Sequence, residues 1–403
     1  MLFAAACVGT SHLVQSTRAG ADYGIALWWV IILACVIKYP AFYFGSLYAA
    51  AAKESLLESY RRLGRWALFL FALELLVNMF VATSAVALIT GGLVNNILHL
   101  GLDPISMAGI LLGACAILLI SGKYHLFENV TTIFVVLFTL LILLVVVLAV
   151  PKFTASVPNL SLHFELDLKT ILFIIAFAGW MPTALGASVF QSLWVCAKSK
   201  DLHRAFTPQE AKFDFNLGYV GTAFIALCFL LLGTVFMHQQ DITVAASAAG
   251  FAGQFIGLFT AAIGDWVYPI IAVAAIAIMV STLLTLLDAC PRALEILVSY
   301  WSPKSEHRSG KFGSYNLFVI IQCIGAMLIL FAFMRSFKTF IDFATSVAFL
   351  VAPFIAYINH RAMFSERVPA ALRPTVVLKI WSILGILALT LFALCYLYFG
   401  VLN

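Results

Sequence analysis

The chain alternates between long apolar runs and short polar stretches over its whole length. Most of these runs approach or exceed the roughly 20 residues that a helix needs to cross the hydrocarbon core of a bilayer. The apolar segments lie at about 2–20, 24–50, 66–93, 105–121, 127–150, 169–196, 215–237, 265–288, 314–334, 339–358 and 376–401. The Ala- and Gly-rich stretch 241–262 predicts a further short external helix. The pattern therefore predicts an all-α polytopic membrane protein with eleven transmembrane helices.

The amino-acid composition excludes a soluble protein. Of 403 residues, 64% are hydrophobic and 10% are charged, whereas soluble chains have about 45–50% apolar and about 25% charged residues. The eight cysteines are scattered without CxxC spacing, which argues against a disulfide or zinc framework. No phosphate-binding loop, nucleophile triad or HExxH helix is present. We therefore expect residues 1–403 to form a single transmembrane domain that is not an enzyme and carries no cofactor.

The distribution of basic residues predicts the orientation in the membrane. Most of the 23 Lys and Arg residues lie in alternate loops, and such loops are cytoplasmic by the positive-inside rule. We expect a cytoplasmic N-terminus, an extracytoplasmic C-terminus and a plasma (inner) membrane location. The lipid bilayer and a small ion or solute are the expected partners, and nucleic acid is not. The sequence is compatible with a monomer but leaves the oligomeric state open.

Two apolar segments are interrupted at membrane depth. The first contains Gly9-Thr10-Ser11-His12, followed by Gln15 and Arg18, and the sixth contains Gly179-Trp-Met-Pro182-Thr183. Pro182 removes a backbone donor and should break its helix. Non-helical backbone at this depth is tolerated only where it lines a cavity or is buried in protein.

The spacing of the two breaks predicts an internal repeat. They stand five segments apart, as in transporters built from two inverted repeats of five helices, which bind substrate near the bilayer midplane. We expect repeat one at about 1–150, repeat two at about 169–358 and an extra helix at about 376–401. An ordinary proline kink in segment six and a surface-lying start of segment one remain the alternative.

Both breaks resemble those of a known family. Residues 15–24 (QSTRAGADYG) with Leu27-Trp28-Trp29 resemble the first and second helices of the Nramp metal-ion transporters, and residues 178–185 (AGWMPTAL) resemble their sixth-helix break. The resemblance implies a LeuT-like fold of five plus five helices and an eleventh. It also implies inward movement of divalent transition metals, usually with protons.

The resemblance also implies which residues bind the metal ion. The family has Asp-Pro-Gly-Asn at the first break, where its acid and amide bind metal; here the acid is absent and His12 takes the amide position. The Ala178 carbonyl and the Met181 thioether correspond to ligands, whereas Thr183 replaces a histidine. Val351 replaces the polar ligand of the tenth helix. This chain is therefore expected to be a divergent member with a neutral metal site.

The side chains at the two breaks include groups that can bind metal ions. Imidazole and thioether ligands suit transition-metal ions, so His12 and Met181 with the Ala178 carbonyl would form a neutral metal site. Thr10, Ser11, Gln15 and Thr183 are expected to line it. Without a carboxylate such a site binds divalent ions modestly and disfavours Mg²⁺ and Ca²⁺. The alternative is a hydrogen-bonded histidine and a methionine that only packs in the core.

Charged residues within apolar segments are further candidates. An acid in a spanning helix is costly and hence a functional candidate, so Glu74 is the candidate proton carrier; in the alternative, Lys38 neutralises it as a structural pair. The third-helix acids of the family align near Val77 and Phe80 instead. Arg18 and Asp22 are spaced i, i+4 and either bond each other along the helix or form an external gate.

Three functions follow from these features. The first is an Nramp-related secondary transporter of divalent transition-metal ions with alternating access. The second is a transporter of a small, amino-acid-like organic solute on the same fold, favoured by the loss of the acidic ligand. The third is a non-transporting protein that kept the fold.

Overall fold

The computed structural model describes residues 9, 11–121, 136–151, 165–201, 203–204, 206–245, 247–301, 314–333 and 337–399. Within these ranges the regular elements are all helical. Seven helices are long and apolar enough to cross a membrane: Ser11–Ala52, Arg65–Ile97, Pro208–Gln240, Asp265–Trp301, Ser314–Ala332, Phe340–Met363 and Val376–Leu397. Shorter apolar helices span Pro104–Ile120, Val136–Pro151, Leu168–Gly179 and Ala248–Ile263. The prediction of a helical membrane protein is confirmed, while the count of eleven spanning helices stays a prediction.

The first long helical stretch is irregular at its start. A π-helical turn, η1 (Ser11–Ser16), leads into α2 (Thr17–Tyr23), and a 3-10 turn, η2 (Gly24–Leu27), joins α2 to α3 (Trp28–Ala52). All six residues of η1 are buried. π-helical turns often occur at functional sites, and this one coincides with the predicted first break.

The third stretch also contains a π-helical turn. It consists of α5 (Arg65–Leu76), the turn η3 (Val77–Ala82) and α6 (Thr83–Ile97). A short amphipathic helix, α4 (Leu56–Leu63), precedes it, and α7 (Pro104–Ile120) follows.

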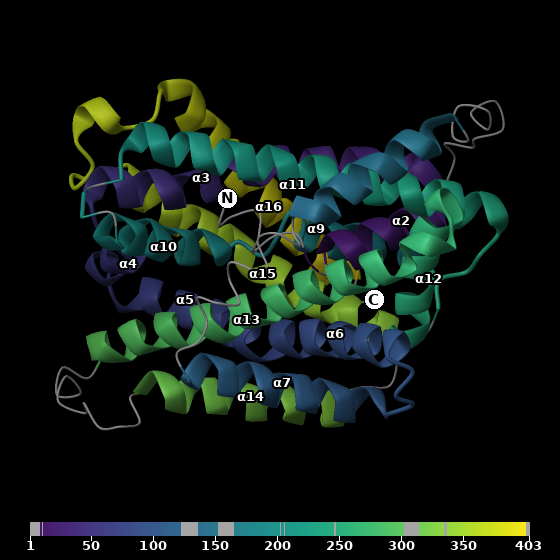
Figure 1. Cartoon of the computed structure of the whole chain (residues 1–403). Helices are drawn as coiled ribbons and strands as arrows, with labels where there is room; N and C mark the ends of the chain where they lie inside the picture. The colour runs from purple at the N-terminus through teal and green to yellow at the C-terminus, as the bar shows by residue number, and fades with distance from the viewer. Residues whose placement is uncertain are drawn as a thin grey trace.

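The sixth stretch is broken, as its sequence predicts. Helix α9 (Leu168–Gly179) ends at the break and α10 (Ala187–Asp201) begins after it. Asp167 caps α9 by accepting a hydrogen bond from the Thr170 backbone N–H at 2.8 Å. Hydrogen bonds from the Thr170 hydroxyl and backbone N–H hold the pKa of this carboxyl below its usual range. Figure 1 shows α9 and α10 in opposite halves of the bundle, so the break lies near its middle.

The remaining helices complete the bundle. They are α11 (Pro208–Phe236), η5 (His238–Gln240), α12 (Ala248–Ile263), η6 (Asp265–Val267), α13 (Tyr268–Trp301), α14 (Ser314–Phe333), α15 (Phe337–Met363), η8 (Ala370–Leu372) and α16 (Val376–Leu397). The predicted helix within 241–262 is confirmed by α12. The expected end of the eighth segment near residue 288 is wrong, because α13 continues through buried Pro291 to Trp301.

Two hydrophobic clusters hold the helices together. One joins α6, α7, α12, α13 and α14, and the other joins α3, α5, α9, α10, α15 and α16. Helix α11 contributes to both, through Phe229 in the first cluster and Phe215 in the second. In Figure 1 the helices run side by side, with α2 and α12 towards one end of the bundle and α4 towards the other.

Candidate functional site

The first break contacts both the sixth break and α11. The Ser11 hydroxyl lies 3.1 Å from the Pro182 carbonyl and 2.8 Å from Nδ1 of His12. The other ring nitrogen of His12, Nε2, lies 3.0 Å from the Thr222 carbonyl of α11. A carbonyl oxygen only accepts, so Nε2 carries a hydrogen and Nδ1 of the neutral ring is the nitrogen with the lone pair.

The three predicted site residues of the sixth break, Ala178, Met181 and Thr183, differ in burial and in hydrogen bonding. Met181 is fully buried and Thr183 is half-buried. The Ala178 carbonyl accepts the Met181 backbone N–H at 3.3 Å. It also accepts the Lys38 ammonium at 2.7 Å, and the neighbouring Gly179 carbonyl accepts the same ammonium at 2.7 Å. A predicted ligand atom is therefore already bound by a cationic side chain.

Glu74 lies at the other side of the sixth break. Its Oε1 accepts the backbone N–H of Gly186, just before α10, at 3.0 Å, and the Asn78 amide at 2.5 Å. Its Oε2 is buried and has no hydrogen-bond partner among the described residues. A Cβ on Gly186 would come within 2.1 Å of both carboxylate oxygens. This close approach needs a glycine and fixes Glu74 at the start of α10.

The alternative pairing of Lys38 with Glu74 is wrong. Lys38 binds carbonyls at the end of α9, whereas Glu74 binds the start of α10. The two charges instead match the helix macrodipole, which is negative at a C-terminus and positive at an N-terminus. The break is thus flanked by a cation at its carbonyl end and an acid at its amide end.

Arg18 forms a buried polar cluster with residues far away in the sequence. Its guanidinium donates to Asp342 of α15 at 2.8 and 3.2 Å and to the Gln15 amide oxygen at 3.0 Å. Gln15 also donates to Asp342 at 3.2 Å, and the guanidinium lies 5.2 Å from the centre of the Phe173 ring. The expected Arg18–Asp22 pair is wrong, since Asp22 is exposed and Asp342 takes its place.

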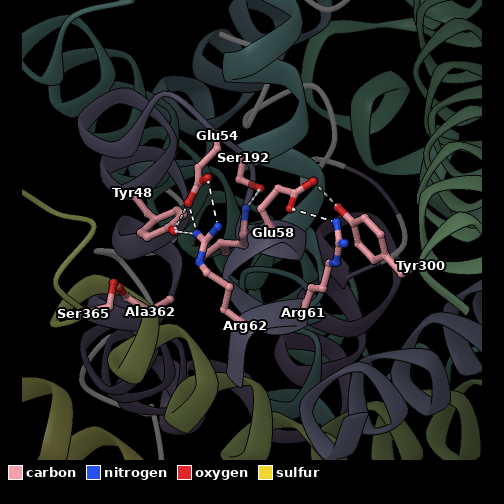
Figure 2. Close-up of polar contacts among 10 residues, drawn as sticks. Tyr48, Glu54, Glu58, Arg61, Arg62, Ser192, Tyr300, Ala362 and Ser365 are labelled. Carbon is pink, nitrogen blue, oxygen red and sulfur yellow. Dashed lines mark hydrogen bonds and ion pairs between the residues drawn. The ribbon is translucent and has the colours of Figure 1, made fainter. Parts of the chain in front are cut away.

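A second polar cluster lies around α4 (Figure 2). The Arg62 guanidinium pairs with Glu54 and donates to the Tyr48 hydroxyl, which in turn donates to Glu54. Helix α4 is tied to α13 by the Tyr300 hydroxyl, which donates to Glu58 at 2.6 Å, and to α10 through Ser192, which accepts the Leu56 N–H. A polar cluster thus lies towards each end of the bundle, one at α2 and one at α4.

The structure describes the positions of most predicted site residues, and their roles as ligands and site-lining residues stay predictions. Thr10 lies outside the described residues. Among the residues with described positions, no group of three or more His, Cys, Asp or Glu side chains could hold a metal ion. Sequence reasoning missed Asp342 as the partner of Arg18 and Lys38 as the partner of the Ala178 carbonyl. Asp342 and Lys38 are charged residues within or next to apolar segments. That unusual position is the sequence feature that could have marked them as functional candidates.

Comparison with solved structures identifies the fold. The manganese transporter of Eremococcus coleocola, in complex with an aromatic bis-isothiourea compound, has a TM-score of 0.67 at 13% identity, covering 100% of this chain and 87% of that one. MhsT in complex with L-phenylalanine has a TM-score of 0.64 at 16% identity, covering 99% and 97%. A Na⁺-coupled sialic acid symporter has a TM-score of 0.60 at 15% identity, covering 99% and 88%. The expected LeuT-like fold is confirmed.

Sequence comparison identifies the family. An uncharacterised protein of Pasteurella multocida is 30% identical over 404 residues, which cover 98% of this chain and 90% of that protein. The model of the family described as "Natural resistance-associated macrophage protein-like" matches residues 1–399. The protein is therefore a membrane transporter rather than an enzyme. The chain belongs to the Nramp family.

Proposed function

We propose that this protein is a secondary transporter of divalent transition-metal ions that works by alternating access through a neutral site between the two breaks. His12 and Met181 would be ligands, with the Ala178 carbonyl as an oxygen donor. Ser11, Gln15, Thr183 and Thr10 would line the site. Membership of the Nramp family and the fold shared with a manganese transporter support a metal ion as cargo.

The orientation of His12 is the observation that carries this proposal. Nε2 is engaged by the Thr222 carbonyl, while Nδ1 faces the Ser11 hydroxyl, which itself contacts the Pro182 carbonyl. Metal-binding histidines usually donate their other N–H to a carbonyl or carboxylate, which fixes the tautomer and the ring. In this tautomer the lone pair of Nδ1 could bind an ion in place of the Ser11 hydroxyl, at the contact between the two breaks.

Glu74 is the proposed proton carrier. It is a buried acid beside the π-helical turn η3, and in the described part of the chain one of its oxygens has no hydrogen-bond partner. Protonation of that oxygen would remove a buried charge and supply a donor. Its contact with Gly186 would couple this change to the start of α10.

Alternating access would use the polar clusters at both ends of the bundle. Arg18 with Asp342 would form the external gate, and the cluster around α4 would close the cytoplasmic side, in agreement with its basic residues. The proposal includes eleven spanning helices in two inverted repeats of five plus one. It also includes a plasma-membrane location, a cytoplasmic N-terminus and an extracytoplasmic C-terminus.

A small organic solute on the same fold remains the alternative cargo. The ammonium of Lys38 at the Ala178 carbonyl favours it, because a fixed cation repels a divalent ion. Solved proteins of this fold include one in complex with L-phenylalanine. A non-transporting protein would bind neither class of ligand.

Binding of metal ions to the purified full-length protein tests the proposal. Thermal stabilisation and calorimetry would compare Mn²⁺, Fe²⁺, Co²⁺, Ni²⁺, Zn²⁺, Cd²⁺, Mg²⁺ and Ca²⁺. The wild type would run beside His12→Ala and the control His360→Ala, which removes a half-buried histidine bonded to Ser382 at 3.0 Å. We expect saturable transition-metal binding that weakens at least tenfold in His12→Ala, about 1.4 kcal/mol, and not in His360→Ala.

The same assays, repeated with amino acids and other small solutes, distinguish the alternatives. Binding of an amino acid without any metal ion would replace the proposed cargo by an organic solute. Equal metal affinity in wild type and His12→Ala would remove His12 from the site. Where metal binds, uptake into proteoliposomes follows, with Glu74→Gln expected to keep metal binding and lose metal-driven proton movement.

A further inference from the structure

Lys38 occupies an unusual position for a charged side chain. It lies near the middle of α3 and is only 1% exposed. Its Nζ donates to the Ala178 and Gly179 carbonyls, both at 2.7 Å. These two residues end α9, so their carbonyl oxygens lack the i+4 N–H groups that a continuing helix would supply, and the Ala178 oxygen accepts only the Met181 N–H at 3.3 Å from the nearby backbone. The ammonium fills the place of the missing donors.

Within the described part of the chain, Lys38 has no carboxylate partner. None of the ion pairs among the described residues includes Lys38. Its surroundings are the two carbonyls and the ring of Phe349, whose centre is 5.6 Å from Nζ. A helix C-terminus carries about half a negative charge, and the face of an aromatic ring attracts cations. Backbone oxygens and dipoles of this kind also hold small inorganic cations.

We propose that the Lys38 ammonium is a tethered cation that fills a carbonyl cation site at the end of α9 and competes with free cations for it. The side chain thereby sets which ions the protein accepts. The inference rests on the proposed function only for the identity of the transported ion, because the site itself follows from the position of Lys38.

Competition follows from the geometry of the Ala178 carbonyl. The atom proposed as an oxygen ligand for the transported ion is the atom to which Nζ already donates. Two cations cannot share one carbonyl at close range without strong repulsion, since little water is present to screen them. An ion that uses this oxygen must move the ammonium aside. Without the ammonium, the carbonyls would form a site of hard oxygen donors, which suits Ca²⁺ and Mn²⁺.

Removal of the charge tests the proposal. Lys38→Met keeps an unbranched apolar side chain, and the control Lys53→Met removes an exposed lysine just after the same helix. Calorimetry on the purified full-length proteins would use Ca²⁺ and Mn²⁺ as probes of the carbonyl site and Cd²⁺ as a probe of the His12 and Met181 ligands. We expect Lys38→Met to bind Ca²⁺ and Mn²⁺ at least tenfold more tightly than wild type, with no gain in Lys53→Met.

A second substitution covers the case in which Lys38→Met does not fold. Lys38→Gln keeps an N–H donor for one carbonyl and removes the charge, so it should show the same gain in smaller measure. Unchanged Ca²⁺ and Mn²⁺ affinity in the folded neutral variants would overturn the inference. Cd²⁺ binding by wild type without any gain in the variants would overturn the inference and leave the proposed function standing. Tighter Ca²⁺ binding in the variants, without Cd²⁺ binding by wild type, would support the inference about Lys38 and contradict the proposed His12 and Met181 metal site.

Discussion

Met181 and Met279 are both fully buried methionines, but only Met181 lies beside an interruption in its helix. Met279 belongs to the continuous helix α13 and packs in a hydrophobic cluster. A thioether in a core contributes packing alone, whereas one beside the carbonyl oxygens that end a helix can also bind a soft metal ion. This pair of residues therefore separates the two interpretations of Met181.

Replacing each methionine by leucine tests the role of the sulfur. Leu and Met have similar volumes, so each substitution should cost below about 1.5 kcal/mol in the free energy of unfolding. We expect Met181→Leu to weaken Cd²⁺ binding about tenfold, or about 1.4 kcal/mol, with a smaller effect on Mn²⁺. Met279→Leu should leave both affinities unchanged by calorimetry. Equal Cd²⁺ affinities in the two variants would assign Met181 to packing.

The sequence identified candidate residues more reliably than it identified the residues that they contact. His12, Met181 and Glu74 stand out because polar residues and a proline interrupt apolar segments. The partners of Lys38 and Arg18 lie 140 and 324 residues away in the chain, and no local pattern connects them. The i, i+4 spacing of Arg18 and Asp22 suggested a pair, but the buried guanidinium contacts a neighbouring helix instead.

At the scale of elements, the Arg18–Asp342 pair joins α2 to the start of α15. The arginine side chain is 5% exposed and the aspartate side chain 35% exposed, so solvent screens the pair only on one side. Breaking it leaves a buried guanidinium with one charged partner fewer. Because the pair ties two elements on one side of the breaks, its loss should loosen that end of the bundle.

Asp342→Asn tests this coupling. We expect a loss of about 1–2 kcal/mol in the free energy of unfolding, below the 3–5 kcal/mol of a fully buried pair because Asp342 is partly exposed. Hydrogen–deuterium exchange should rise in α2 and in the first turns of α15, while α4 stays unchanged. Asp265→Asn, at an exposed acid, serves as the control. Uniform exchange throughout both variants would show that the pair does not close one end.

Element boundaries were predictable where the sequence contains strong breaking residues. Gly179 and Pro182 located the break between α9 and α10, and the apolar run after Lys311 located α14. The turn η3 (VNMFVA) contains neither proline nor glycine, so its π-helical form depends on tertiary packing. Helix α4 has eight residues and an amphipathic pattern, which a search for long apolar runs passes over.

At the scale of the whole molecule, apolar surface faces outward. In the most apolar windows of α14 and α16 only 22% of residues are buried, against 67% in the stretch α5–α6. Exposed Leu, Ile and Phe side chains cover the outer faces of both helices. Such a surface is stable in lipid and not in water, which is why composition alone sufficed to predict the membrane environment.

The orientation of the whole chain can be measured directly. Because most Lys and Arg residues lie in alternate loops, we expect the positive-inside rule to place the C-terminus outside the cytoplasm. A C-terminal alkaline phosphatase fusion should be active, and a C-terminal green fluorescent protein fusion should be dark. The opposite pair of results would invert the predicted topology and exchange the assignment of the two gates.

The opposite charges that flank the helix break bear on how transport is energised. With both groups ionised, the charges of Lys38 and Glu74 sum to zero, so the chain adds no net negative charge there to travel with a divalent ion. An ion that crosses alone then carries two positive charges through the membrane electric field, which is worth about 2.3 kcal/mol per charge at 100 mV. The resulting free energy of about 4.6 kcal/mol would support a concentration of the ion inside the cell about a thousandfold higher than outside. Under the proposed function, uptake would then generate an electrical current, and the membrane voltage would add to whatever driving force the proton carried by Glu74 supplies.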